Sequence, residues 1–267
     1  MSLDLEQQYA VDALQEIDRI CKLHNIEYLL VAGTTLGAVR HGGMIPWDND
    51  IDIGLTYDNW IALRRIIVHE LDPKFTYIDD VTDSTYPRFF GKVLYDGLGC
   101  LDVFLLAKWP LSDLNSLIHW RIRKFAVEGY KYEINKRTSL NFKKIKSMRY
   151  FFYILSTKIQ KMIYTALHPF VNKDFYSQIA RKLEHFYNNA NEYQYINLYS
   201  IYRRKKEYIK REWVDSPSMV TFEGKKYPTM GDTDAYLTHL YGDYMTPPPE
   251  SQRIKESRHT ERFGEAQ

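Results

Sequence analysis

Hydrophobic positions at the start of the chain follow first a helical period and then a strand pattern. Apolar residues recur at intervals of three and four over residues 4–23, which predicts an amphipathic helix. Residues 26–32 (IEYLLVA) form a short apolar run and predict a buried strand. The glycine that follows predicts a tight turn over 33–35, and a short helix is expected over 36–41.

Alternating apolar residues predict further strands downstream. Residues 50–55 (DIDIGL) alternate strictly, and a helical spacing follows between Thr56, a possible N-cap, and Pro73. Two apolar runs, 89–95 and 99–106, flank an Asp-Gly pair, which is a strong hairpin signal. We therefore expect helices and strands to alternate in this part of the chain, as in an α/β protein.

Long helical patterns rich in Lys, Arg and Tyr begin after Pro110 and divide the chain into segments 1–112, 113–195 and 196–267. Lys+Arg against Asp+Glu is 9 to 17 in the first segment, 15 to 6 over residues 113–192, and 12 to 11 over the remainder. An acidic segment is what a cation site needs, whereas a basic one suits phosphate, nucleic acid or anionic lipid.

The basic middle contains forty residues, 134–173, with nine Lys or Arg and no acid. Apolar residues over 151–166 follow a helical face, so this stretch could make peripheral contact with an anionic membrane surface. An ordinary core helix with a solvated basic face is the alternative. No nucleic-acid-binding module accompanies the charge, and we expect no nucleic-acid partner.

The composition excludes disordered and membrane-spanning classes. The chain has 267 residues, of which 45% are hydrophobic and 26% charged, as in ordinary globular proteins. Its two cysteines lack zinc-ligand spacing and favour a reducing compartment. The first residues do not resemble a signal peptide, and no apolar run reaches the length of a membrane span, so a cytoplasmic location is expected, with possible peripheral contact at the inner face of a membrane.

Acidic residues on two predicted strands carry the candidate chemistry. Asp50 and Asp52 are two residues apart, so their side chains should share a face, and Asp102 lies in a second strand. Adjacent carboxylates need a compensating cation, and oxygen ligands suit Mg²⁺, with Mn²⁺ possible. Asp48 has the same parity and could be a fourth acid. A solvated acidic turn stays open as the alternative, whereas an EF-hand loop would need a glycine and a glutamate where this chain has Ile and Asn.

Residues 33–52 (GTTLGAVRHGGMIPWDNDID) closely resemble the signature of the LicD family of phosphotransferases, which includes phosphocholine transferases and relatives of fukutin-related protein. Further segments resemble the family in the same order: Phe90-Gly91-Lys92-Val93, Leu101-Asp102-Val103-Phe104, Leu240-Tyr241-Gly242-Asp243-Tyr244, Pro247-Pro248 and His259. The resemblance covers both ends of the chain, and it is weak over about 113–195.

The resemblance implies an α/β (α+β) fold with a nucleotidyltransferase-like core, a small mixed sheet, a helical basic insertion, and a C-terminal segment that completes the site. In such folds the segment Gly33-Thr34-Thr35 holds phosphate, and Asp50 with Asp52 binds Mg²⁺. Asp102 would be the third metal ligand and could accept the proton of the attacking hydroxyl.

The family's chemistry implies the substrates. The expected donor is CDP-linked, most simply CDP-choline, from which phosphocholine passes to a sugar hydroxyl of a cell-surface glycan, a lipid-linked glycan or a teichoic-acid-type precursor. Transfer of ribitol phosphate or glycerol phosphate, transfer of a nucleotidyl group, and a non-catalytic member that binds a nucleotide or glycan are the alternatives.

Five further residues are assigned to substrate or catalysis. Arg40 could hold a phosphate oxygen or instead pair with Asp48 or Asp50, and His41 could carry a proton or simply end a helix. Lys92 could reach phosphate or be an exposed edge lysine. The last two are Asp48, beside the metal acids, and His259, which the resemblance suggests folds back to the site.

Overall fold

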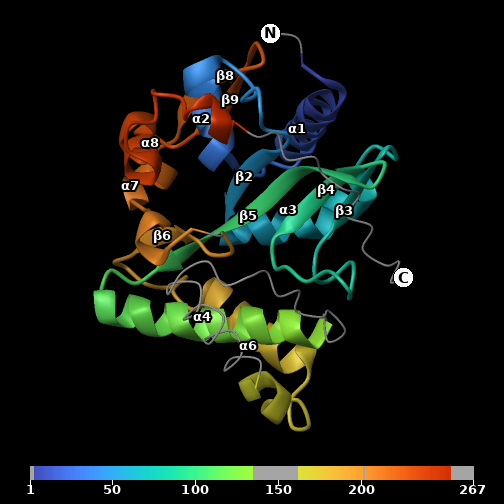
Figure 1. Ribbon diagram of the computed structural model, residues 1–267, viewed down its shortest axis with the longest axis vertical. Helices are drawn as coiled ribbons and strands as arrows, with labels where there is room; N and C mark the ends of the chain where they lie inside the picture. Colours follow the sequence, from blue (N-terminus) through green and yellow to red (C-terminus); the bar gives the residue numbers. More distant parts are fainter. Residues whose placement is uncertain (1–2, 135–161, 201, 254–267) are drawn as a thin grey trace. The chain divides into compact units, whose positions relative to one another are not determined.

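The structure is a computed structural model, and it describes residues 3–134, 162–200 and 202–253. Helices and strands alternate from Leu5 to Ile78, as the sequence predicts for this part of the chain (Figure 1). No helix within the described residues is long and apolar enough to cross a membrane.

The chain forms two compact units. Unit 1 comprises residues 1–113 and 184–267, and unit 2 comprises residues 114–183. The expected division into a nucleotidyltransferase-like core (1–112), a helical basic region (113–195) and a C-terminal segment that completes the site (196–267) stays a prediction.

The elements of unit 1 up to the long strand β5 are α1 (Leu5–Leu23), β1 (Leu29–Leu30), α2 (Ala32–His41), β2 (Ile51–Thr56), α3 (Tyr57–Glu70), β3 (Phe75–Ile78), β4 (Gly91–Tyr95) and β5 (Leu98–Trp109). The helices α4 (Asp113–Ile134) and α6 (Lys173–His185) belong mainly to unit 2. Unit 1 then continues with β6 (Gln194–Asn197), η1 (Arg204–Lys206), β7 (Tyr208–Ile209), α7 (Arg211–Asp215), β8 (Ser218–Phe222), β9 (Lys225–Thr229), α8 (Thr233–Tyr241) and η2 (Glu250–Gln252).

The strands form one mixed sheet, nine-stranded over the described residues, in the order β3-β4-β5-β2-β1-β9-β8, with β6 beside β5 and β7 beside β6. β2 and β5 are parallel, whereas β4 pairs with β5 antiparallel through a two-residue turn, Asp96-Gly97. Both turn residues have positive φ, 47° and 78°, which is the conformation that an Asp-Gly hairpin turn favours. The mixed sheet and its helices confirm the expected fold class.

Helices α1 and α3 both pack on β2 and β5 (Figure 1). The fully buried residues Ile51, Ile53, Leu101 and Val103 alternate along these two strands with the acids Asp52 and Asp102. Because successive side chains of a strand point to opposite faces, this alternation sends the apolar and acidic side chains to different sides of the sheet. The strand pattern therefore positions the acids.

Helix α2 begins earlier than the sequence predicts. The expected turn over 33–35 lies within the first turn of the helix, and the expected strand over 26–32 is reduced to Leu29–Leu30. The N-cap is Val31, whose side chain makes no capping bond, so the usual Ser, Thr or Asp signal for a helix start is missing from the sequence. Ala32 follows with φ 48°, and its N–H donates to the Tyr236 hydroxyl, 3.0 Å away. A distant side chain therefore helps to set this boundary.

Unit 2 is held by an aromatic cluster between its helices. Phe125 of α4, Tyr164 and Tyr176 of α6 lie with ring centroids 5.4 to 5.9 Å apart. Gly129 allows this approach, because a Cβ there would lie 2.3 Å from the Tyr176 ring. Most of the helix expected over 151–166 lies outside the described residues; the described part, from residue 162, is helical.

Candidate metal and phosphate site

Asp52, Asp102 and Lys92 form a row across three neighbouring strands. Asp52 of β2 is the register partner of Asp102 of β5, and Lys92 of β4 is the register partner of Asp102 on its other side. Asp50, just before β2, completes a group of three acids with Asp52 and Asp102. One carboxylate oxygen from each of the three lies within 4.8 Å of the others. The structure thus brings together the three residues that the sequence assigns to a metal.

The negative charges at this row act strongly on Asp52. Desolvation, followed by the charges of Asp50, Asp102 and Asp48, raises the pKa of Asp52 well above its ordinary value, and Lys92 acts in the opposite direction. A carboxylate held under these conditions gains from a bound cation.

Lys92 is an internal ion-pair partner, not an edge residue. Its ammonium lies 2.5 Å from Asp102 Oδ1, and the residue is 3% exposed. The alternative of an exposed edge lysine is wrong, because β4 lies between β3 and β5. Lys92 provides one positive charge to a row that carries more than one negative charge.

The first turn of α2 lies directly against the acids. A Cβ added to Gly33 would lie 3.2 Å from Asp48 Oδ2 and 3.9 Å from Asp52 Oδ2. Thr34 Oγ1 accepts a hydrogen bond from the Asp52 N–H at 2.7 Å, and so ties α2 to β2. Gly33 is therefore the residue that leaves space beside the carboxylates.

The hydroxyl groups of Thr34 and Thr35 form hydrogen bonds within the protein. Thr35 is fully buried, and its hydroxyl donates to the Leu30 carbonyl at 2.7 Å and lies 3.1 Å from the Thr229 hydroxyl. Thr34 is 4% exposed and holds Asp52. The Thr34 hydroxyl therefore joins α2 to β2, and the Thr35 hydroxyl joins α2 to β1 and β9. Phosphate binding by Gly33-Thr34-Thr35 stays a prediction.

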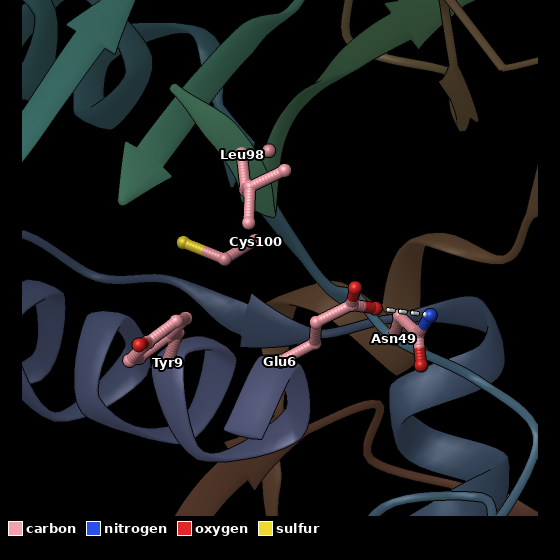
Figure 2. Close-up of a pocket in the computed structure, with 6 residues that line it drawn as sticks. Glu6, Tyr9, Asn49, Leu98 and Cys100 are labelled. Carbon is pink, nitrogen blue, oxygen red and sulfur yellow. Dashed lines mark hydrogen bonds between the residues drawn. The ribbon is translucent and has the colours of Figure 1, made fainter. Parts of the chain in front are cut away.

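The segment between α2 and β2 is fastened to helix α1. The Gln7 side chain donates to the carbonyls of Ile45 (3.2 Å) and Asp48 (2.9 Å). Figure 2 shows Glu6 extending from α1 to Asn49, whose amide donates to the Glu6 carboxylate at 2.7 Å. A small pocket there is lined by Glu6, Asn49, Tyr9, Leu98, Gly99 and Cys100, and so lies between α1 and the start of β5.

The hairpin of β8 and β9 fastens the same segment from another side. Glu223, at the tip of the hairpin, accepts from the Met44 N–H at 2.8 Å, and its own N–H donates to the Gly42 carbonyl at 3.0 Å. A Cβ at Gly43 would lie 1.9 Å from a Glu223 side-chain oxygen, so a larger residue there would displace the Glu223 carboxylate. Sequence reasoning missed Gln7, Glu6 and Glu223, because no local pattern reports contacts across such separations.

Arg40 and His41 end α2 beside Trp47. Arg40 Nη1 donates to the Tyr244 carbonyl at 2.8 Å, and within the described residues Arg40 forms no ion pair with Asp48 or Asp50. The His41 ring meets Trp47 edge-on at 5.9 Å. Burial lowers the pKa of both residues, and the charge of Arg40 lowers that of His41 further. His259 lies outside the described residues.

Three tyrosines from the C-terminal part of unit 1 lie near Asp52, whose charge acts on all of them. Desolvation first, and the Asp52 charge among other groups, raise the pKa values of Tyr202, Tyr236 and Tyr241. The rings of Tyr202 and Tyr241 lie edge to face with centroids 6.4 Å apart. Among 22 tyrosines, the sequence could not single out these three.

The donor set fits a hard divalent cation. The three acids offer carboxylate oxygens, which Mg²⁺ and Mn²⁺ prefer, and Asp102 is also paired with the buried Lys92.

Comparison with known proteins gives a consistent result. Residues 25–90 match the model of the family described as LicD/FKTN/FKRP, nucleotidyltransferase domain. The lipopolysaccharide cholinephosphotransferase LicD of Haemophilus influenzae is 22% identical, and the match covers 95% of each chain. Human ribitol 5-phosphate transferase FKRP is 28% identical over 40% of this chain and 22% of its own length. An uncharacterised protein of Rickettsia prowazekii is 33% identical over 36% of this chain and 32% of its own length.

The family match begins before β1 and runs through α2 and β2 to the segment before β4, so it contains Gly33, Asp50 and Asp52. The match with the cholinephosphotransferase covers 95% of this chain, well beyond the segment that the family model matches. Residues 25–90 therefore match the nucleotidyltransferase domain of the LicD family, and the chain resembles a cholinephosphotransferase of that family over nearly its whole length.

Proposed function

We propose that this protein transfers phosphocholine from CDP-choline to a sugar hydroxyl of a glycan or lipid-linked glycan. The observation that carries the proposal is the group of Asp50, Asp52 and Asp102, whose oxygens converge within 4.8 Å beside the first turn of α2. The end-to-end similarity to a cholinephosphotransferase supports the choice of headgroup.

The three acids would hold Mg²⁺, which supplies charge neutralisation for the donor diphosphate. The acceptor hydroxyl oxygen attacks the phosphorus of the phosphocholine group, the bond from that phosphorus to the CMP oxygen breaks, and CMP leaves. Asp102 is our candidate to take the proton of the attacking hydroxyl. The Lys92 ammonium, 2.5 Å from Asp102 Oδ1, fixes the position of this carboxylate.

A cationic headgroup has aromatic rings available near the acids. Tyr202 is 37% exposed, lies edge to face with Tyr241, and is within the electrostatic reach of Asp52. The faces of tyrosine rings attract quaternary ammonium groups, so we assign the choline moiety to this pair. Tyr202→Ala should raise the KM for CDP-choline several-fold and leave the KM for CDP-glycerol unchanged.

The test of the function is a turnover screen. The purified chain is supplied with CDP-choline, CDP-ribitol, CDP-glycerol or CTP, in Mg²⁺ and in EDTA, with a lipopolysaccharide or teichoic acid preparation as acceptor. We expect CMP release from CDP-choline in Mg²⁺ and none in EDTA. Preference for CDP-ribitol or CDP-glycerol would change the headgroup, and pyrophosphate release from CTP would make the protein a nucleotidyltransferase.

A further inference from the structure

Two guanidinium groups lie over the same indole ring. The Cζ atom of Arg253 is 5.2 Å from the centre of the Trp47 ring, and that of Arg40 is 6.0 Å from it. Arg40 ends α2, whereas Arg253 follows η2 at the other end of the chain. All three residues are partly exposed, so a ligand can reach them.

Backbone carbonyls hold both guanidinium groups in place. Arg40 Nη1 donates to the Tyr244 carbonyl at 2.8 Å, and Arg253 Nε donates to the Pro248 carbonyl at 2.7 Å. Within residues 3–134, 162–200 and 202–253, neither arginine forms an ion pair with an acid. Each guanidinium has five N–H donors, so most of them stay available.

The two positive charges oppose each other. Burial lowers the pKa of Arg40, and the charge of Arg253 lowers it further. Over the described part of the chain no carboxylate pairs with either arginine, so the two like charges repel each other, and a bound oxyanion would offset the repulsion.

This pair lies close to the acid site. Trp47 immediately precedes Asp48, and Asp48 Oδ2 would be 3.2 Å from a Cβ at Gly33, next to Asp52. Arg40 follows Gly33 on α2 by two helical turns, about 10 Å along the axis. A substrate that carries phosphate groups could therefore occupy both places.

We propose that Arg40 and Arg253 form a phosphate-binding clamp over Trp47, with Arg253 as its second arm. The assignment deepens the proposed function and rests on it for the source of the phosphate. That source is either the CDP-linked donor or a phosphate group carried by the acceptor, and both offer the oxyanion that paired guanidinium donors bind.

The first arm of the test is calorimetric. The full chain, its Arg253→Gln and Arg253→Lys variants, and a control variant, Arg211→Gln, are titrated with inorganic pyrophosphate and with CMP in EDTA. Arg211 is a matched control, because it also lies over a tyrosine ring, Tyr193 at 4.7 Å, but is paired with Asp215. For a donor phosphate we expect Arg253→Gln to weaken binding about tenfold or more. Arg253→Lys should lose less affinity, and Arg211→Gln none.

The second arm measures the KM of the acceptor at saturating CDP-choline. Unchanged calorimetry with a raised acceptor KM in Arg253→Gln assigns the clamp to an acceptor phosphate. Unchanged pyrophosphate binding, CMP binding and acceptor KM in a folded Arg253→Gln variant overturn the proposal. Arg253-dependent pyrophosphate binding without any transfer would keep the clamp and reject the phosphocholine assignment, so the two failures are distinguishable.

Discussion

At the scale of single residues, Asp52 shows the effect of neighbouring carboxylates at the candidate metal site. Its carboxyl group is desolvated among Asp48, Asp50 and Asp102, while Lys92 offsets only part of their charge. Such a site favours a bound cation over an empty, fully ionised state. The titration of Asp52 and the affinity of the site for a cation therefore both depend on the negative charge gathered there.

The Asp52→Asn variant should lose transfer by on the order of a hundredfold or more, because a ligand worth several kcal/mol of charge stabilisation is removed. The melting temperature in EDTA should stay the same or rise, since one of four clustered charges is gone. Steady-state CMP release and thermal melting measure the two effects. Near-normal turnover in Mg²⁺ would contradict the assignment of Asp52 to the metal.

The stability of the metal-free chain should depend on pH through Asp52. Its pKa is raised in the folded state, so the folded chain binds more protons than the unfolded chain above about pH 4, and stability falls as pH rises through the folded pKa. Asp52→Asn should be more stable than wild type at pH 8 and equal to it near pH 4. Urea unfolding of both chains across this range in EDTA gives the difference. A difference independent of pH would show that Asp52 is not the titrating group.

At the scale of elements, the segment between α2 and β2 is positioned by its neighbours. Gln7 of α1 and Glu223 of the β8–β9 hairpin bind its backbone from two sides, and Trp47 has arginines over its ring. The segment delivers Asp48 and Asp50 to the site. Its geometry therefore depends on elements that carry no catalytic group.

Gln7→Ala should destabilise the chain by about 1–3 kcal/mol, because it leaves the carbonyls of Ile45 and Asp48 without their side-chain donor. Transfer should fall as well, as Asp48 and Asp50 lose their support. Gln8→Ala is the matched control: Gln8 is the exposed neighbour and bonds only Asp12, one turn along the helix. Urea unfolding and turnover compare the two variants. Equal effects would mean that the bonds of Gln7 do not position the segment.

Local patterns predicted the elements that local forces determine. The helix over 4–23, the Asp96-Gly97 hairpin and the strands that carry Asp52 and Asp102 follow from periodicity and turn chemistry. The start of α2 did not, because Val31 is a poor N-cap and Tyr236, about two hundred residues away, binds the Ala32 N–H. The Lys92–Asp102 pair depends on strand register, and Arg253 reaches Trp47 through tertiary folding. Neither has a local signal.

At the scale of the whole molecule, unit 2 offers a surface of a different character from the site. Helix α4 exposes an apolar stripe at helical spacing: Leu114, Leu117, Ile118 and Ile122. The sequence around it, residues 113–192, carries 15 Lys or Arg against 6 acids. Exposed apolar side chains in a segment of the sequence with a positive net charge suit an anionic membrane surface.

The double variant Leu117→Asn with Ile118→Asn should weaken co-sedimentation with vesicles that contain phosphatidylglycerol, and it should leave transfer to a soluble acceptor unchanged. Binding of the wild type should also weaken as salt rises, because part of the attraction is electrostatic. Val68→Asn is the control, since Val68 is 51% exposed but lies on α3 of unit 1. If the double variant co-sediments with the vesicles as well as the wild type does, this stripe does not bind the membrane.

The chain leaves unit 1 after β5 and returns to it before β6. The strand β5 ends at Trp109 and its register partner there is Gln194 of β6, so the strands that flank the insertion are neighbours in the same sheet. An insertion between adjacent strand ends can lengthen, shrink or be replaced without a change in strand order. The module between β5 and β6 can therefore be exchanged in evolution while Asp52 and Asp102 keep their positions on β2 and β5.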